Sequence, residues 1–173
     1  DRAGETLAKI HAASRADNSL KSRFDTSEQF TALRIDPYLL TTGRRHPNLQ
    51  SRLAAEAQRL LRTREALVHG DYSPKNLLVR TEPGRLVLVD CEVAWYGDPS
   101  FDVAFLINHL VLKSLYHGKT AGGSFVQEAE RFATAYRRNL GDEAWAVVID
   151  GRAANLLPML MLARVDGKSP VEY

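Results

Sequence analysis

The chain of 173 residues contains a single cysteine, Cys91, so it cannot form an internal disulfide. Disulfides belong mainly to oxidising compartments, and their absence favours a cytoplasmic protein. The longest unbroken apolar run, residues 156–163, is far shorter than the roughly 20 residues that span a bilayer. No basic segment leads into an apolar one at the N-terminus. We therefore expect neither a targeting signal nor a membrane anchor.

An excess of charge of one sign is also missing. Lys and Arg together number 23 and Asp and Glu 21, which leaves a formal net charge of +2. This balance gives no reason to expect a nucleic acid or a membrane surface as partner. Hydrophobic residues make up 45% of the chain and charged residues 25%, which fits one globular domain with a real core.

Strand patterns are scarce in the sequence. Two short apolar runs, residues 77–79 and 86–89, flank a Pro83-Gly84 turn signal and predict one β-hairpin. Apolar residues recur at helical spacing in five segments, namely 5–14, 51–66, 102–113, 125–140 and 144–164. The pattern predicts an α+β, mostly helical fold with one small hairpin near its middle.

Three interruptions complete the expected outline. Residues 19–37 show little periodicity and are expected to be loop. The glycines of residues 118–123 separate two helices, and Pro158 is expected to break the last one.

Chemically capable side chains gather on both sides of the predicted hairpin. Asp71 and Asn76 precede it and Asp90 follows it, so the hairpin folds Asp90 back beside Asn76. Phosphoryl transfer from a nucleotide needs Mg²⁺, oxygen ligands that hold it, and a residue that orients the attacking hydroxyl and accepts its proton. The spacing therefore indicates Asp71 as the base, and Asn76 and Asp90 as metal ligands.

Residues 69–79, 89–92 and 97–104 resemble, in the same order, three motifs of the aminoglycoside phosphotransferase and choline kinase superfamily. The resemblance implies the C-terminal lobe of a protein-kinase-like fold, with the hairpin carrying the catalytic and metal-binding residues. It also implies transfer of the γ-phosphoryl group of ATP or GTP, with Mg²⁺, to a hydroxyl of a small molecule. Acceptors of this kind are aminoglycosides, sugars, amino alcohols and related metabolites.

The resemblance assigns further roles. Ser73 stands where protein kinases usually have a phosphate-contacting lysine, and we expect it beside the nucleotide, as in members with small-molecule substrates. Asp102 is implied as the carboxylate that ties down the catalytic loop, and His69 as a buried residue that steadies it. Glu92 could contact metal through water or hold substrate. Arg164 could reach the substrate or cap the C-terminus of its helix.

A glycine-rich phosphate loop and a strand lysine with its glutamate partner are both missing from the sequence. We therefore expect residues 1–173 to be one lobe of a longer chain whose N-terminal lobe grips the nucleotide. The isolated lobe is expected to fold but not to turn over, because positioning of the nucleotide needs both lobes.

Two other functions are compatible with parts of the pattern. A catalytically inactive kinase-fold protein could bind nucleotide or a partner, but it has no chemical reason to keep Asp71, Asn76 and Asp90. A metal-dependent phosphohydrolase built on His69, Asp71 and Asp90 would need further ligands at close spacing. Outside these motifs, Trp95 and Tyr96 fit either substrate stacking or the core.

Overall fold

The computed structural model describes residues 1–80, 86–168 and 170, apart from the side chains of residues 119–121. Its helices are α1 (Arg2–Arg15), α2 (Leu20–Arg23), α3 (Ser27–Phe30), the π-helix η1 (Thr31–Leu40), α4 (Thr41–Arg45), α5 (Gln50–Arg62), the short 3₁₀ turns η2 (Pro74–Asn76) and η3 (Cys91–Val93), α6 (Ser100–Leu140) and α7 (Glu143–Asp166). Its strands are β1 (Ala66–Val68), β2 (Leu77–Val79), β3 (Leu86–Leu88) and β4 (Trp95–Gly97). The mostly helical α+β class is confirmed.

The predicted hairpin is present as β2 and β3, which pair antiparallel with Leu77 opposite Leu88. Its expected Pro83-Gly84 turn lies outside the described residues. A second antiparallel pair, β1 with β4, was not predicted, and it sets Val68 opposite Trp95. Strands of three residues are too short to show a period of two in the sequence. This pair matters for the site, because it joins the strand before the loop that carries Asp71 to the strand that follows Asp90 and η3.

The loop expected at residues 19–37 is wrong, since α2, α3 and most of η1 lie there. A π-helix places its hydrogen bonds at i→i+5, so its apolar residues do not recur at the α-helical period, and Pro37 adds a misleading break signal. Ile35, Tyr38 and Leu39 of η1 are buried. The segment therefore contributes to the core and, as shown below, to the site.

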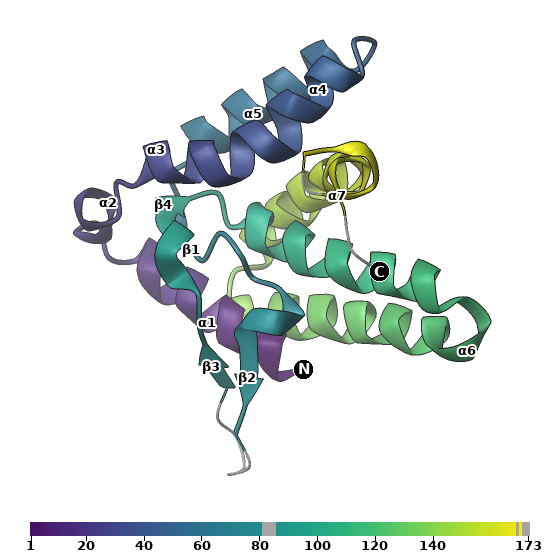
Figure 1. Ribbon diagram of the computed structural model, residues 1–173. Coiled ribbons are helices and arrows are strands. Elements are labelled where there is room, and N and C mark those ends of the chain that lie inside the picture. The colour runs from purple at the N-terminus through teal and green to yellow at the C-terminus, as the bar shows by residue number, and fades with distance from the viewer. Residues whose placement is uncertain (81–85, 169, 171–173) are drawn as a thin grey trace.

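The two predicted helices around residues 118–123 form the two arms of α6, which turns back on itself (Figure 1). The break is at Gly118, whose φ of 52° and ψ of −128° are not helical. A side chain at Gly122 would lie 2.6 Å from the Ser114 carbonyl oxygen, which shows how closely the arms approach. Both α1 and α7 pack against α6.

Helix α7 continues past Pro158, so the break expected there is wrong. Leu156, Met159 and Leu160 are buried on either side of the proline, and their packing holds both halves of the helix in line. By length and composition α7 is apolar enough to cross a membrane. Eight of its residues, from Trp145 to Ala163, are buried, and the helix packs against α6.

The core continues as a row of aromatic rings beneath the site. Phe30 stacks on Trp95 at 4.5 Å between centroids and meets Phe101 edge-on at 4.9 Å. Phe101 stacks on Phe105, and Phe105 packs against Tyr38. Trp95 and Tyr96 are both buried, which decides between their two expected roles in favour of the core.

Candidate active site

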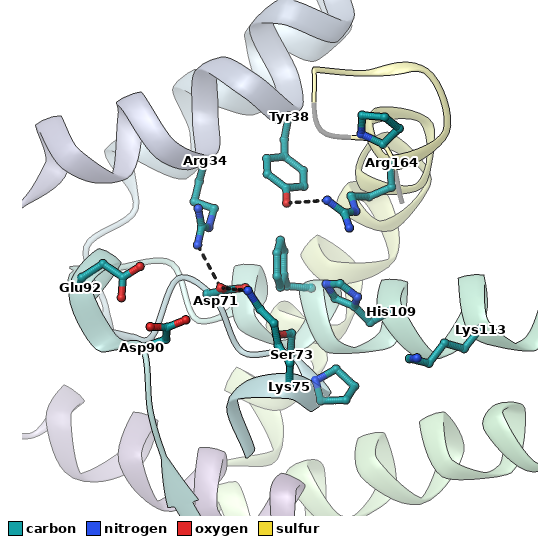
Figure 2. A pocket seen from close by; sticks show the side chains of 13 residues that line it. Arg34, Tyr38, Asp71, Ser73, Lys75, Asp90, Glu92, His109, Lys113 and Arg164 are labelled. Atoms are coloured by element: carbon teal, nitrogen blue, oxygen red, sulfur yellow. Dashed lines mark hydrogen bonds and ion pairs between the residues drawn. The ribbon is translucent and has the colours of Figure 1, made fainter. Parts of the chain in front are cut away.

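A cavity of about 750 Å³ opens between η1, the hairpin end, α6 and the end of α7 (Figure 2). Its lining residues are Arg34, Tyr38, Asp71, Ser73, Pro74, Lys75, Asp90, Glu92, Phe105, His109, Lys113, Arg164 and Pro170. The volume is within the range of small-molecule sites. Four residues that the sequence analysis singled out around the hairpin meet here, namely Asp71, Ser73, Asp90 and Glu92. Arg164 joins them from the far end of the chain.

The loop between β1 and η2 carries the predicted base, and Asp102 holds it in place. The Asp102 carboxylate accepts hydrogen bonds from the amides of His69 at 2.7 Å and Gly70 at 2.9 Å. Gly70 has a φ of 78°, and a side chain there would lie 2.8 Å from the Val93 carbonyl oxygen. Only glycine fits this turn without strain, so the loop's path is set by Gly70 and its two anchored amides.

The His69 ring is bonded on both sides. Its Nε2 lies 3.1 Å from the Val89 carbonyl oxygen, and its Nδ1 accepts from the Asp71 amide at 3.2 Å. These two bonds require the tautomer with hydrogen on Nε2. His69 thus ties the loop before Asp71 to the strand that leads to Asp90, and its placement agrees with a steadying role.

Asp71 is buried and faces two cations. Its Oδ2 lies 3.2 Å from the Lys75 Nζ and 3.4 Å from an Arg34 Nη. Arg34 also donates from Nε to the Gly70 carbonyl oxygen at 2.5 Å. The sequence analysis missed Arg34, because it lies in η1 within the segment expected to be loop. Its contact with Asp71 spans 37 positions, so no local pattern could have revealed it.

Asn76 does not line the cavity but lies directly behind Asp71. Its Nδ2 donates to the Asp71 carbonyl oxygen at 2.9 Å, and its own carbonyl accepts from the Val89 amide at 3.2 Å. The side-chain bond orients the amide so that Oδ1 remains an available acceptor. The backbone bond extends the hairpin ladder to the residue before Asp90, which is how the hairpin brings Asp90 to the site.

Asp90 lines the cavity in a left-handed conformation, with φ 64° and ψ 46°. Among the described residues it is the only non-glycine with positive φ. Such a conformation is sparsely populated and concentrates at functional sites. It turns the chain sharply from β3 into η3, and this turn also puts Glu92 on the cavity wall (Figure 2).

Ser73 is fully buried and lines the cavity, and none of the described residues forms a hydrogen bond with its Oγ. A buried hydroxyl without a partner costs free energy unless a ligand or water completes it. Its position between Asp71 and Asn76 makes a phosphate oxygen a suitable acceptor.

Arg164 lies on the cavity wall opposite Asp90, with Nη1 3.5 Å from the Tyr38 hydroxyl. Both of its expected roles fit in part, since it belongs to the last turn of α7 and also faces the cavity. Beside it, burial lowers the pKa of His109 to about 4, with the charge of Arg164 as the next cause. The His109 ring is therefore neutral near pH 7.

This pKa predicts a pH-dependent stability. An unfolded histidine takes up a proton as the pH falls below about 6.5, whereas folded His109 stays neutral until about pH 4. Its contribution is therefore complete above about pH 6.5 and is lost as the pH falls toward 4. Between about pH 7 and pH 5, His109 lowers the free energy of unfolding by up to about 2 kcal/mol. We expect His109→Gln to abolish this decrease, measured by urea denaturation at both pH values. The partly exposed ring makes this an upper bound. An unchanged pH profile would contradict it.

The donor set fits Mg²⁺. The Asp90 carboxylate and the Asn76 amide oxygen are hard oxygen ligands, and Mg²⁺ usually takes one or two such protein groups and fills its other positions with water and phosphate. Within residues 1–80, 86–168 and 170, no three His, Cys, Asp or Glu side chains gather as a metal centre. A site with many protein ligands, as the phosphohydrolase hypothesis needs, is thus not found in the described part of the chain.

Comparison with known protein families places the chain in one of them. The model of the phosphotransferase enzyme family matches residues 1–148, which include the hairpin, the loop between β1 and η2, all of α6 and the start of α7. A search of curated proteins found no match.

Proposed function

Because the chain belongs to the phosphotransferase enzyme family, we propose that it transfers the γ-phosphoryl group of ATP or GTP, with Mg²⁺, to a hydroxyl of a small molecule. One observation carries this proposal: Asp71 and Asp90 line the same cavity, and the Asn76 amide is bonded directly behind Asp71. A base and two oxygen ligands in this arrangement supply what phosphoryl transfer requires of a protein.

In the proposed reaction the acceptor hydroxyl donates a hydrogen bond to the Asp71 carboxylate. The oxygen of the acceptor hydroxyl forms the new bond to the γ-phosphorus, while the bond between the γ-phosphorus and the oxygen of the leaving nucleoside diphosphate breaks. Asp71 takes the proton of the hydroxyl. Asp90 and Asn76 would hold Mg²⁺, which when bound would neutralise the charge of the phosphates. The buried Ser73 hydroxyl would donate to a phosphate oxygen, a partner that the described part of the chain does not supply.

The cations around Asp71 have a role in the same scheme. Arg34 and Lys75 hold the carboxylate at its Oδ2, which leaves the other oxygen for the acceptor hydroxyl. Asp102 and His69 keep the loop backbone in place, and Glu92, which lines the cavity together with Asp90, would bind a metal-bound water or the acceptor.

We propose that residues 1–173 act as the catalytic C-terminal lobe of a protein-kinase-like fold, with a nucleotide-gripping lobe elsewhere in the parent chain, in the cytoplasm. The absence of a glycine-rich phosphate loop from the sequence supports this division. An inactive binding protein is less well supported, because the chain keeps the base and both metal ligands.

The direct test is an activity assay of the full-length protein with Mg²⁺ and ATP or GTP over a panel of hydroxyl compounds. Production of nucleoside diphosphate together with a phosphorylated acceptor is the expected result. Nucleotide binding without transfer to any acceptor would favour the inactive binding protein, and hydrolysis of phosphoesters without nucleotide would favour the hydrolase.

Substitution of Asp90 tests the proposed metal site. We expect Asp90→Ala to weaken binding of magnesium-nucleotide by at least about tenfold, because one of two protein ligands is lost. Binding of nucleotide without Mg²⁺ should change little. Calorimetric titration with and without Mg²⁺ measures both, and Asp25→Ala, at an exposed carboxylate outside the cavity, is the control. If the two variants bound magnesium-nucleotide equally, Asp90 would not be a ligand.

A further inference from the structure

Lys75 lies in η2, directly after the loop that carries the proposed base, and lines the cavity (Figure 2). The backbone of this turn is held by Asn76, whose amide donates to the Ser73 carbonyl oxygen and whose side chain donates to that of Asp71, both at 2.9 Å. The Lys75 Nζ lies 3.2 Å from Asp71 Oδ2. A long side chain on a well-held turn therefore brings a cation to the centre of the proposed site.

Two cations contact the same oxygen of Asp71, and they differ in how they are held. The Arg34 guanidinium is used at every nitrogen. Its Nε donates to the Gly70 carbonyl oxygen and its Nη1 to the Leu33 carbonyl oxygen, while the remaining Nη2 lies at Asp71. The Arg34 side chain is 12% exposed, against 67% for Lys75. Arg34 is thus a fixed support of the loop, whereas the Lys75 side chain can reorient toward a ligand.

The Lys75 ammonium group can also bond more than one partner at a time. An ammonium group carries three hydrogens, so one hydrogen directed at Asp71 leaves two. Within residues 1–80, 86–168 and 170, Asp71 is the only group that pairs with the Lys75 Nζ. A ligand in the cavity can therefore accept a hydrogen bond from Lys75 while the pair with Asp71 is kept.

The position of Lys75 is close to the group that is transferred. In the proposed reaction the acceptor hydroxyl lies about 3 Å from the Asp71 carboxylate, and the γ-phosphorus lies about 3–3.5 Å from that hydroxyl. The phosphorus is then within about 6.5 Å of the carboxylate that Lys75 contacts. Two anionic groups at this separation repel each other, and a cation that contacts both relieves the repulsion.

Resting on the proposed function, we propose that Lys75 is a further catalytic residue, whose ammonium group bridges the Asp71 carboxylate and an oxygen of the γ-phosphoryl group during transfer. The bonds that form and break are those described above, and Asp71 takes the hydroxyl proton. Lys75 neither gives nor takes a proton. It stabilises the negative charge on the phosphoryl oxygens in the transition state, so it raises turnover more than nucleotide affinity.

A transition-state analogue separates this role from mere support of Asp71. The full-length protein is titrated by calorimetry with Mg²⁺ and ADP or GDP, with and without fluoroaluminate, which takes the place of the γ-phosphoryl group. We expect Lys75→Gln to weaken binding of the fluoroaluminate complex by about 10²-fold, and binding of the magnesium diphosphate alone by less than about threefold. If Lys75 only oriented Asp71, wild type and variant would bind the fluoroaluminate complex equally, and the proposal would be overturned.

Two further variants assign the effect to the cation at this position. Lys75→Arg keeps a cation and should hold turnover within about tenfold of wild type, while Lys75→Gln lowers it about 10²-fold. Lys9→Gln is the matched control, because Lys9 pairs with Glu5 at the same spacing of four residues, is equally exposed at 67%, and does not line the cavity. It should change neither turnover nor analogue binding. Equal turnover of Lys75→Gln and Lys9→Gln would overturn the proposal.

The binding assay and the transfer assay decide different questions. Transfer by the wild type, together with equal analogue binding by Lys75→Gln, would refute the role of Lys75 and leave the phosphotransferase standing. Lys75-dependent binding of the analogue, in a protein that transfers phosphate to no acceptor, would support the contact between Lys75 and the γ-phosphoryl group and refute the activity.

Discussion

Replacing Asp71 with asparagine is expected to lower turnover of the full-length protein by about 10³-fold, with magnesium-nucleotide affinity nearly unchanged. Asparagine keeps the shape of the side chain but cannot take the acceptor's proton. In the proposed scheme other groups hold the nucleotide, namely Ser73 and the metal ligands Asn76 and Asp90. Steady-state kinetics give the turnover, and calorimetry gives the nucleotide affinity.

One control variant and the expected stability of the loop keep this result interpretable. Asp25→Asn makes the same chemical change at an exposed site and should leave turnover unaffected. The fold of Asp71→Asn should survive, because Arg34 still bonds the Gly70 carbonyl and Asp102 still holds the loop amides. A large loss of nucleotide affinity in Asp71→Asn, equal to that of Asp90→Ala, would contradict the division of roles between base and metal ligand.

The sequence predicted the centre of this site because its geometry is local. Asp71 and Asn76 are five positions apart, and a hairpin with a short turn leaves one place for Asp90, next to the residue bonded to Asn76. Turn signals and apolar runs at this scale follow from nearby residues alone. The helical class was equally predictable from the sequence, since α1, α5 and the second arm of α6 each bury one stripe of residues.

The cavity's walls could not be predicted in the same way. Arg34 and Tyr38 reach the site from a π-helix, whose period differs from that of an α-helix and so hides its apolar face in the sequence. Arg164 contacts Tyr38, which lies 126 positions earlier in the chain. Contacts of that kind depend on how helices pack, which one sequence does not reveal. The β1–β4 pair was missed for a related reason, because three-residue strands carry too few side chains to show alternation.

Asp102→Asn is expected to cost about 3 kcal/mol of unfolding free energy, although Asp102 touches no proposed ligand. The carboxylate is fully buried and accepts from two amides of the catalytic loop, one on each oxygen. Asparagine offers one oxygen, and its NH₂ group would face the other amide donor. The variant therefore loses one charge-assisted bond and leaves a buried donor without a partner, and these losses add.

The side chains next to Asp102 do not compensate for the hydrogen bond that Asp102→Asn removes. His11 Nε2 lies 3.5 Å from Asp102 Oδ2, and His11 Nδ1 lies 2.8 Å from the Tyr136 hydroxyl. Burial, with the charge of Asp102 as the next cause, raises the pKa of Tyr136, so this hydroxyl stays protonated and donates to Nδ1. His11 Nε2 forms no hydrogen bond with the described residues, so it is not an established partner for the NH₂ group of an asparagine at position 102.

Urea denaturation measures the effect, with Asp36→Asn as the matched control. Asp36 is only partly buried and pairs with the exposed Arg44, so its change should stay within about 0.5 kcal/mol. If Asp102→Asn were equally mild, the loop amides would have found other acceptors, and the loop would not depend on Asp102. If stability falls as expected while turnover of the remaining folded protein also drops, the same two amides both stabilise the fold and position Asp71.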